Sequence, residues 1–387
     1  MSARRIVLAS IGRFHYGTLA SELWSRGRLE AFYSAFFRSR LRCHDVPADR
    51  LRTWPWVQTP LTIAERSGLF PDRLIQAWMH LAHRTLDRHI ARVLPDCDVY
   101  AALAGCAVES GAIAKRRGMR VVCERSSPHI RWDEETMERE CARWDLPFKR
   151  LNPALVDRDE QEYAQADRII VVSEHSRGTF LERGFDPDRL RVVAPDIDLP
   201  SFGSPCGTAR ERRPCKGLRI LFVGQMGVRK GLHVLLHAHK RAELGGSEIV
   251  CAGASGRVTR TILSRFPDAP VRNLGHLSHP SLVEQFQAAD LTVVPSVSDG
   301  LPLVVYEALA HGCPVVVSDA CGASEAVIDD VNGLVFPSGD VEALATILRR
   351  FVDEPELAER LRAGVERAGA TWNVDGAYAD RWIEAIQ

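Results

Sequence analysis

The first half of the chain alternates short apolar runs with segments of helical periodicity. The apolar runs IVLASIG, DVYAALAG, VVCERS and ADRIIVVSE have the length and the β-branched content of buried strands. Polar and apolar residues between these runs repeat at helical spacing, as in TLASELWSRG. Strands that alternate with helices are typical of a parallel sheet with helices on both faces, so the pattern predicts an α/β domain.

The alternation lapses between residues 200 and 217, where PSFGSPCGTARERRPCKG is rich in Pro, Gly and Arg. A second series of strand-like runs follows: LRILFVGQ, SEIVCAG, PVRNLG, ADLTVVPS, CPVVVSD and NGLVFP. We therefore predict two doubly wound, Rossmann-like α/β domains. Their expected bounds are 1–200 and 217–370, with a linker at 201–216 and a C-terminal helix in 371–387 that packs back on the first domain.

Residues 22 to 93 are less regular, and the stretch RLEAFYSAFFRSRLR mixes four aromatic residues with arginines. One interpretation is a patch that contacts a membrane surface or an acidic acceptor. The other, which we favour, is a strand and loop whose aromatic side chains fill the core while the arginines face water. The residues concerned are Phe32, Tyr33, Phe36, Phe37, Arg38, Arg40 and Arg42. A helix is predicted after this stretch, with Leu74, Trp78, Leu81, Ile90 and Val93 at helical spacing.

The amino-acid composition and net charge exclude several classes of protein. Hydrophobic residues make up 45% and charged residues 26% of the 387 residues, as in ordinary globular proteins, and the formal net charge is zero. A neutral chain argues against a general nucleic-acid binder. No apolar run approaches the ~20 residues of a membrane-spanning helix. The ten cysteines form no CxxC pair, so we expect neither a zinc site nor a disulfide scaffold, and a reducing cytoplasm is the simplest location.

The stretch SDGLPLVVYEALAHGCPVVVSD, residues 298–319, carries two acids inside an apolar region. It predicts a tight turn after a strand, a helix from Pro302 to His311, a C-cap at Gly312 and then another strand. In such a unit the helix N-terminus and the strand ends face one crevice that favours an anion. Asp299 is then expected at its rim, and Glu307 on the helix can lean back toward it to accept hydrogen bonds from sugar or ribose hydroxyls.

A second turn in the same domain also has the features of a phosphate site. The strand LRILFVG leads into QMGVRKG, where Gly224, Gly227 and Gly231 allow close backbone approach and Lys230 adds a positive charge. Only five lysines occur in the chain, which makes Lys230 notable. The spacing is neither that of a Walker loop nor GxGxxG.

Taken together and in this order, the stretches FVGQMGVRKGLHVLLHA, SDGLPLVVYEALAHGCPVVVSD and GASEAVIDDVNGLVFPSGDVEAL resemble the donor-binding half of retaining glycosyltransferases of family 4, within glycosyltransferase group 1. The resemblance is strong over residues 160–350 and weak before them. It implies the GT-B fold, two Rossmann-like domains facing a central cleft. It also implies transfer of a sugar, with retention of its anomeric configuration, from a nucleotide sugar to a hydroxyl acceptor.

The resemblance assigns roles by position. Lys230 and Arg229, with the turn of Gly224 and Gln225, would bind the donor diphosphate, aided by the amide turn that Gly300, Leu301 and Pro302 form. Glu307 would hold the ribose hydroxyls, and Asp299 would contact the transferred sugar. UDP-sugar or GDP-sugar is the expected donor, and no cofactor or metal is required.

The sequence also departs from the family pattern. Gln225 stands where many members carry an arginine, and Asp299 is one carbon shorter than the usual glutamate. The PNGVD segment appears as APDIDL. In the first domain, SIGRFHYGT replaces the glycine-rich loop, and Arg125 stands where the family has its active-site histidine, with His129 close enough to serve instead. Arg125 and His129 are therefore our two candidates for a catalytic group in that domain.

The resemblance also suggests an acceptor, a location in the cell and two alternative functions. We expect a glycan or lipid-linked acceptor of cell-envelope polysaccharide synthesis, no nucleic acid, and a cytoplasmic enzyme that contacts the membrane peripherally. A nucleotide-sugar epimerase and a non-catalytic nucleotide-sugar-binding subunit are the alternatives. Two DxD pairs, Asp96/Asp98 and Asp196/Asp198, raise the question of a metal, but aspartate is common at such turn positions, so we expect no metal site.

Overall fold

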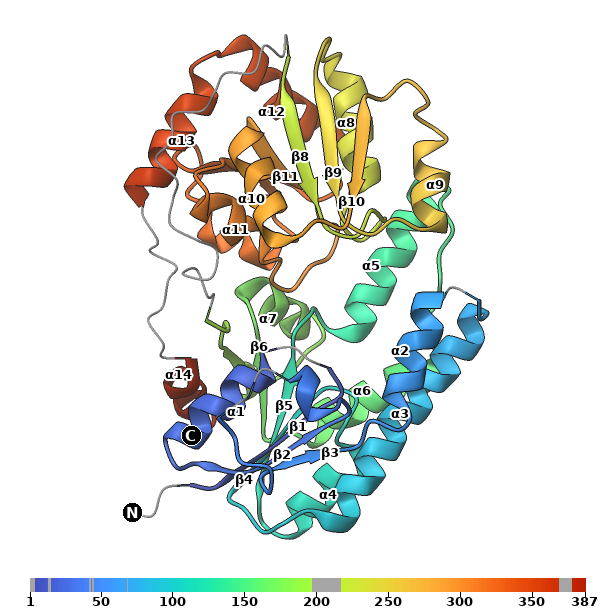
Figure 1. Cartoon of the computed structure of the whole chain (residues 1–387), viewed down its shortest axis with the longest axis vertical. Coiled ribbons are helices and arrows are strands. Elements are labelled where there is room, and N and C mark those ends of the chain that lie inside the picture. Colours follow the sequence, from blue (N-terminus) through green and yellow to red (C-terminus); the bar gives the residue numbers. More distant parts are fainter. Residues whose placement is uncertain are drawn as a thin grey trace. The chain divides into compact units, whose positions relative to one another are not determined.

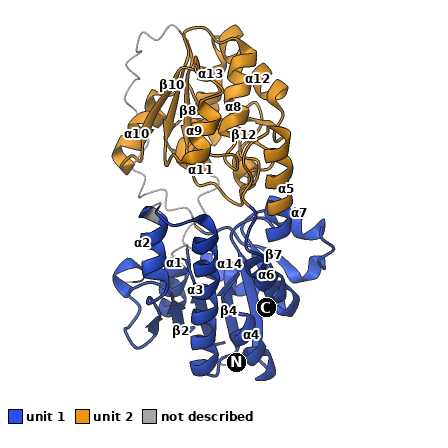
Figure 2. Cartoon of the chain, turned by 90° about the vertical axis from the view of Figure 1, so that its right-hand side faces the viewer, with its two compact units in different colours: residues 1–132, 150–195, 376–387 blue, residues 133–149, 196–375 orange. Residues whose placement is uncertain are grey.

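The structure, a computed structural model, divides into two compact units. It describes residues 4–12, 15–41, 43, 45–67, 69–196, 217–368 and 378–387. The described parts of 1–132, 150–195 and 376–387 form unit 1, and those of 133–149 and 196–375 form unit 2 (Figure 2). The sequence placed residues 133–149 in the first domain, whereas here they cluster with unit 2 because Cys141 and Leu146 lie in its core. The predicted linker, 201–216, lies outside the described residues.

Unit 1 contains a seven-stranded parallel sheet in the order β3-β2-β1-β4-β5-β6-β7 (Figure 1). Its strands are β1 (Ile6–Ser10), β2 (Leu29–Ser34), β3 (Leu51–Thr53), β4 (Val99–Leu103), β5 (Arg120–Arg125), β6 (Arg168–Val171) and β7 (Leu190–Val192). Its helices are α1 (Tyr16–Ser25), α2 (Gln58–Ser67), α3 (Asp72–Val93), α4 (Val108–Arg116), α6 (Pro153–Gln165), α7 (Glu174–Leu181) and α14 (Tyr378–Ala385), while α5 (Ile130–Arg143) begins here and continues into the residues of unit 2.

The C-terminal helix α14 is part of the core of unit 1. Trp382 is fully buried, and it shares a cluster with residues of β1, α1 and β5. Its indole nitrogen donates to Glu124 Oε2 on β5 at 3.1 Å. A helix from the far end of the chain thereby completes the first unit.

Unit 2 contains a six-stranded parallel sheet in the order β10-β9-β8-β11-β12-β13. Its strands are β8 (Arg219–Val223), β9 (Glu248–Ala252), β10 (Val271–Gly275), β11 (Leu291–Val294), β12 (Val315–Ser318) and β13 (Gly333–Phe336). Its helices are α8 (Leu232–Ala242), α9 (Arg257–Leu263), α10 (His279–Ala288), α11 (Val304–Ala310), α12 (Val341–Asp353) and α13 (Leu357–Ala368).

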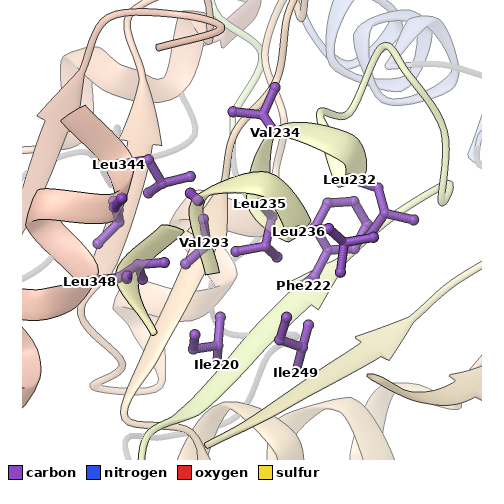
Figure 3. Packing of buried hydrophobic residues seen from close by; sticks show 14 of the residues in the cluster. Ile220, Phe222, Leu232, Val234, Leu235, Leu236, Ile249, Val293, Leu344 and Leu348 are labelled. Atoms are coloured by element: carbon purple, nitrogen blue, oxygen red, sulfur yellow. The ribbon is translucent and has the colours of Figure 1, made fainter. Parts of the chain in front are cut away.

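The sheet of unit 2 is covered on both faces. Leu235 of α8 and Leu348 of α12 pack with Ile220 and Val293 on one face (Figure 3). Residues of α10 and α11, including Phe286 and Val305, pack with Leu221 on the other. The prediction of two doubly wound α/β domains is confirmed. Within the described parts of the chain, no helix is long and apolar enough to cross a bilayer.

Candidate functional site

The turn between β8 and α8 brings Lys230 to the carboxyl edge of the sheet in unit 2. Gly231 has φ +73°, and a Cβ there would lie 1.7 Å from the carbonyl oxygen of Pro295. Only glycine therefore allows the start of α8 to approach the loop after β11 this closely. The amide of Val297 donates to the carbonyl of Arg229 at 2.8 Å and ties the two loops together. Two turns far apart in the sequence thus form one site.

An ion cluster forms where these turns meet. Lys230 Nζ contacts Asp299 Oδ2, and Arg229 Nη1 lies 3.6 Å from Asp299 Oδ1. The Asp299 carboxylate is only 6% exposed, whereas Arg229 is exposed. The backbone N–H groups of Arg229 and Lys230 have no hydrogen-bond acceptor among the described residues. Two cations and two available amide donors at a helix N-terminus suit an anion such as a diphosphate.

The loop after β11 fixes the position of Asp299. Its amide donates to the carbonyl of Ala320 at 3.1 Å, and its carbonyl accepts from Gly322 at 2.9 Å. The hydroxyl of Ser296 donates to Asp299 Oδ2 at 3.3 Å. The carboxylate is therefore directed at Lys230 by both backbone and side-chain contacts.

Glu307 lies on α11, which begins at Val304 and ends at Ala310, so the helix is shorter than predicted; Gly312 follows it with φ +71°. Burial raises the pKa of Glu307, and His279 opposes this shift. Glu307 is half-buried and makes no side-chain hydrogen bond or ion pair with another described residue. A carboxylate in this situation can accept hydrogen bonds from ligand hydroxyls. Glu307 lies on the helix that follows the Asp299 loop, and it is not part of the ion cluster of Lys230, Arg229 and Asp299.

The other predicted donor-site residues lie in the same two loops. Gly224 has φ +131°, and a Cβ added there would lie 3.7 Å from Lys230 Cε, so the lysine side chain runs along this glycine. Gln225 is exposed next to it. Gly300 and Pro302 are buried and Leu301 is half-buried between Asp299 and α11.

Arg125 and His129 belong to unit 1 and differ from each other in environment. Arg125 Nη1 donates to Asp159 Oδ2 at 2.6 Å, and its Nε donates to the carbonyl of Pro128 at 3.2 Å. His129 is 1% exposed, and its ring packs against Phe180 and Tyr163. Burial lowers the pKa of His129 to about 4. These ring contacts fix the imidazole of His129 in the core of unit 1, and its catalytic role stays a prediction.

Two residues of the site carry no signal in the sequence. Ser296 directs Asp299, and Asp133 accepts a hydrogen bond from Ser298 at 2.5 Å. Serine is common in loops, and Asp133 comes from a helix more than 150 residues earlier, so neither spacing nor periodicity points to them.

The two DxD pairs have structural partners where they are described. Asp98 accepts from the amide of Arg5 at 2.6 Å, and Asp96 lies 3.7 Å from Arg117. Asp198 lies outside the described residues. Within the described ranges, no group of three or more His, Cys, Asp or Glu side chains gathers as metal ligands would.

Comparison with known proteins agrees with this geometry. Residues 209–367, less than half of the chain, match the family model described as Glycosyl transferases group 1. The chain is 34% identical over 285 residues to the D-inositol 3-phosphate glycosyltransferase of Thermomonospora curvata and 32% identical over 273 residues to that of Xylanimonas cellulosilytica. Its second half is therefore similar to the group 1 glycosyltransferases. The two matches take in 62% and 61% of this chain and 66% and 65% of the relatives, just under two thirds of their length.

Solved structures identify the fold of this chain as GT-B. Sucrose-phosphate synthase of Thermosynechococcus elongatus superposes with a TM-score of 0.68 at 19% identity, over 98% of both chains. HepE of Anabaena, solved in complex with UDP, gives a TM-score of 0.63 at 15% identity, also over 98% of both chains. The prediction of the GT-B fold is confirmed. The match of residues 209–367 agrees with the predicted similarity to group 1, while membership of family 4 stays a prediction.

Proposed function

We propose that the protein is an enzyme that transfers a sugar from a nucleoside-diphosphate sugar to a hydroxyl acceptor, with retention of the anomeric configuration. The observation that supports this best is the ion cluster of Lys230, Arg229 and Asp299 at the N-terminus of α8. Since HepE was solved with UDP, we infer a UDP-sugar as the first donor to test and a GDP-sugar as the second.

In this proposal each residue meets a definite need of the reaction. As the bond to the sugar breaks, negative charge develops on the leaving diphosphate, and Lys230 with the amides of the α8 N-terminus stabilises it. Glu307 accepts hydrogen bonds from the ribose hydroxyls, and Asp299 contacts the transferred sugar and orients Lys230. Because these groups are fixed by the fold before the donor binds, they need little rearrangement during the reaction.

The acceptor of the transferred sugar supplies the attacking hydroxyl group. We infer a glycan or lipid-linked saccharide, used by a cytoplasmic enzyme at the membrane surface. The names of the relatives in Thermomonospora and Xylanimonas favour a second class, a phosphorylated cyclitol. Both classes offer a secondary hydroxyl, so the same donor chemistry serves either of them.

The test is nucleotide release from a panel of UDP-, GDP- and ADP-sugars, each with no acceptor, with lipid extract or with inositol phosphate. A transferase releases nucleotide faster with an acceptor, and nuclear magnetic resonance of the product reports its anomeric configuration. An epimerase converts the nucleotide sugar without an acceptor, and a binding subunit gives affinity without turnover. Inversion at the anomeric carbon would contradict the proposed retention.

We also expect full activity after exhaustive chelation of metal ions, because no residue in the proposed mechanism needs a metal. Loss of activity on chelation, with recovery that requires Mn²⁺ or Mg²⁺, would contradict a metal-free mechanism.

Replacement of Glu307 tests the ribose contact. We expect Glu307→Ala to weaken binding of the nucleotide by about 1.5 to 3 kcal/mol, the range for a hydrogen bond to a charged group. Because burial raises the pKa of Glu307, the carboxylate is lost on acidification at a higher pH than for an ordinary glutamate, so wild-type affinity should fall as the pH drops through that raised pKa. Isothermal titration calorimetry at several pH values measures both effects.

The control for this experiment is Glu284→Ala, since Glu284 is an exposed acid on α10 of the same unit. That variant should bind like the wild type. Glu307→Gln should lose the pH dependence assigned to this carboxyl. Equal wild-type affinity for ribonucleotides and 2′,3′-dideoxynucleotides would remove the ribose contact from the proposal.

A further inference from the structure

Helices α2 and α3 of unit 1, with the segments before and between them, expose many large apolar side chains. Seven of the twelve exposed large hydrophobic residues in the described part of the chain fall between residues 37 and 81. Leu69 is 82% and Trp56 67% exposed. The small core between the two helices contains four buried apolar residues, Leu61, Ala64, Ile75 and Ala82, and two of them are alanines. Such an accumulation marks an interaction surface.

The exposed residues are ordered rather than scattered. Phe37 and Trp56 meet edge to face at 6.3 Å between ring centroids, and Phe70 meets Trp78 in the same way at 6.4 Å. Leu74 and Leu81 are spaced by seven residues, so they lie on one face of α3 with Trp78 between them. The helix instead buries the face that contains Ile75, Ala82, Leu86 and Ile90.

The same region is strongly basic. Residues 36–93 contain ten arginines, no lysine and five acids, a net charge of +5 in a chain whose net charge is zero. Asp87 is buried and paired with Arg158, while Arg88 and Arg50 are paired with Glu109 and Glu30 from outside this stretch, so eight arginines and four acids remain. Arg73 and Arg84 are exposed on α3 next to the apolar face. We call the exposed apolar side chains of residues 37–81, with Arg73 and Arg84, the α2–α3 surface.

We propose that the α2–α3 surface docks on an anionic lipid bilayer. Trp, Phe and Leu side chains partition into the boundary between headgroups and acyl chains, while arginine binds lipid phosphates, and stable attachment needs both contributions. A second copy of the chain would bring two positive surfaces together, and a nucleic acid would leave the apolar side chains exposed to water. The inference does not depend on the proposed chemistry, because none of these residues belongs to the donor site.

The experiment is sedimentation of the full chain with vesicles of phosphatidylglycerol and phosphatidylcholine, compared with vesicles of phosphatidylcholine alone. We expect binding only to the anionic vesicles, weakening as salt is raised. Each arginine near the surface contributes about fivefold in affinity, so Arg73→Gln/Arg84→Gln should weaken binding about 25-fold. Leu74→Ser/Leu81→Ser should weaken it by at least as much. Brominated acyl chains should quench tryptophan fluorescence in the wild type and less in Trp56→Phe.

Matched controls come from unit 2. Val352 is 51% exposed, as is Leu74, and Arg260 and Arg367 are exposed arginines. Val352→Ser and Arg260→Gln/Arg367→Gln should bind vesicles like the wild type. All variants should keep the wild-type melting temperature and nucleotide affinity, which separates docking from folding and from the donor site. No binding to anionic vesicles, equal binding to neutral ones, or a concentration-dependent dimer that Leu74→Ser/Leu81→Ser abolishes would each overturn the proposal.

Discussion

Lys230→Ala is expected to lower the kcat of sugar transfer by about a hundredfold or more, the usual cost of removing one preorganised group that stabilises developing charge. Lys230 lies at the N-terminus of α8 and contacts the Asp299 carboxylate. Steady-state kinetics with a saturating donor measures the effect. Lys240→Ala, at an exposed lysine of the same helix, should leave kcat unchanged. A Lys230→Ala variant within a few-fold of the wild type would remove this lysine from the mechanism.

A structural effect of the same substitution can be separated from the catalytic one. Removing Lys230 leaves the nearly buried Asp299 carboxylate with its weaker partner, Arg229, which destabilises the fold. The double variant Lys230→Ala/Asp299→Asn has no negative charge at position 299, so no buried carboxylate is left without its lysine. We therefore expect the double variant to melt at a higher temperature than Lys230→Ala, although below the wild type. Its turnover should be as low as that of Lys230→Ala.

Asp299→Asn should have opposite effects on binding and on turnover. The substitution removes the negative charge that faces Lys230 and Arg229, so both cations become available to a diphosphate. A diphosphate must compete with the Asp299 carboxylate for these cations. If that ion pair contributes about 1 kcal/mol, its loss should raise the affinity for the bare nucleoside diphosphate about fivefold. Transfer should fall about a hundredfold, because Lys230 is no longer held in place and the sugar loses its contact.

Calorimetry with the nucleoside diphosphate and turnover with a panel of donors measure these two effects. Glu284→Gln is the control for loss of one acid from the same unit, and it should change neither quantity. Asp299→Glu should alter the ranking of donor sugars, since it extends the carboxylate by about 1.5 Å. If Asp299→Asn leaves affinity, rate and ranking as they are in the wild type, Asp299 is only a loop residue.

Much of the fold and of the donor site can be predicted because local rules decide it. The strand β11, the turn at Asp299 and Gly300, and the helix α11 follow one another within about twenty residues, and each is specified by its own apolar run, its breaker or its periodicity. The glycines of the β8–α8 turn are equally local, since Gly224 and Gly231 adopt positive φ values. The sequence therefore located Lys230, Asp299 and Glu307.

The sequence is less informative where several elements surround the same side chain. His129 is a catalytic candidate because it lies close to Arg125, which stands where the family has its active-site histidine. Its packing against Tyr163, Phe180 and Phe185, which come from positions 34 to 56 further along the chain, could not be predicted, and its catalytic role stays a prediction. In RLEAFYSAFFRSRLR, the strand-and-loop interpretation is confirmed for Phe32 and Tyr33, which are buried in β2, whereas Phe37 is exposed. Periodicity reports which residues share a face, but not whether that face is covered.

The sequence by itself determined the two α/β domains, the alternation of strands and helices in them, and the residues of the proposed donor loops, because these depend on neighbours a few positions away. Tertiary structure decided which of those residues meet. Lys230 and Asp299 are 69 positions apart, and they form an ion pair only because β8 and β11 are adjacent in the sheet and Gly231 lets the two loops touch. It also decided which apolar face of α3 is buried, since both faces carry apolar residues and only packing against α2 and the sheet distinguishes them.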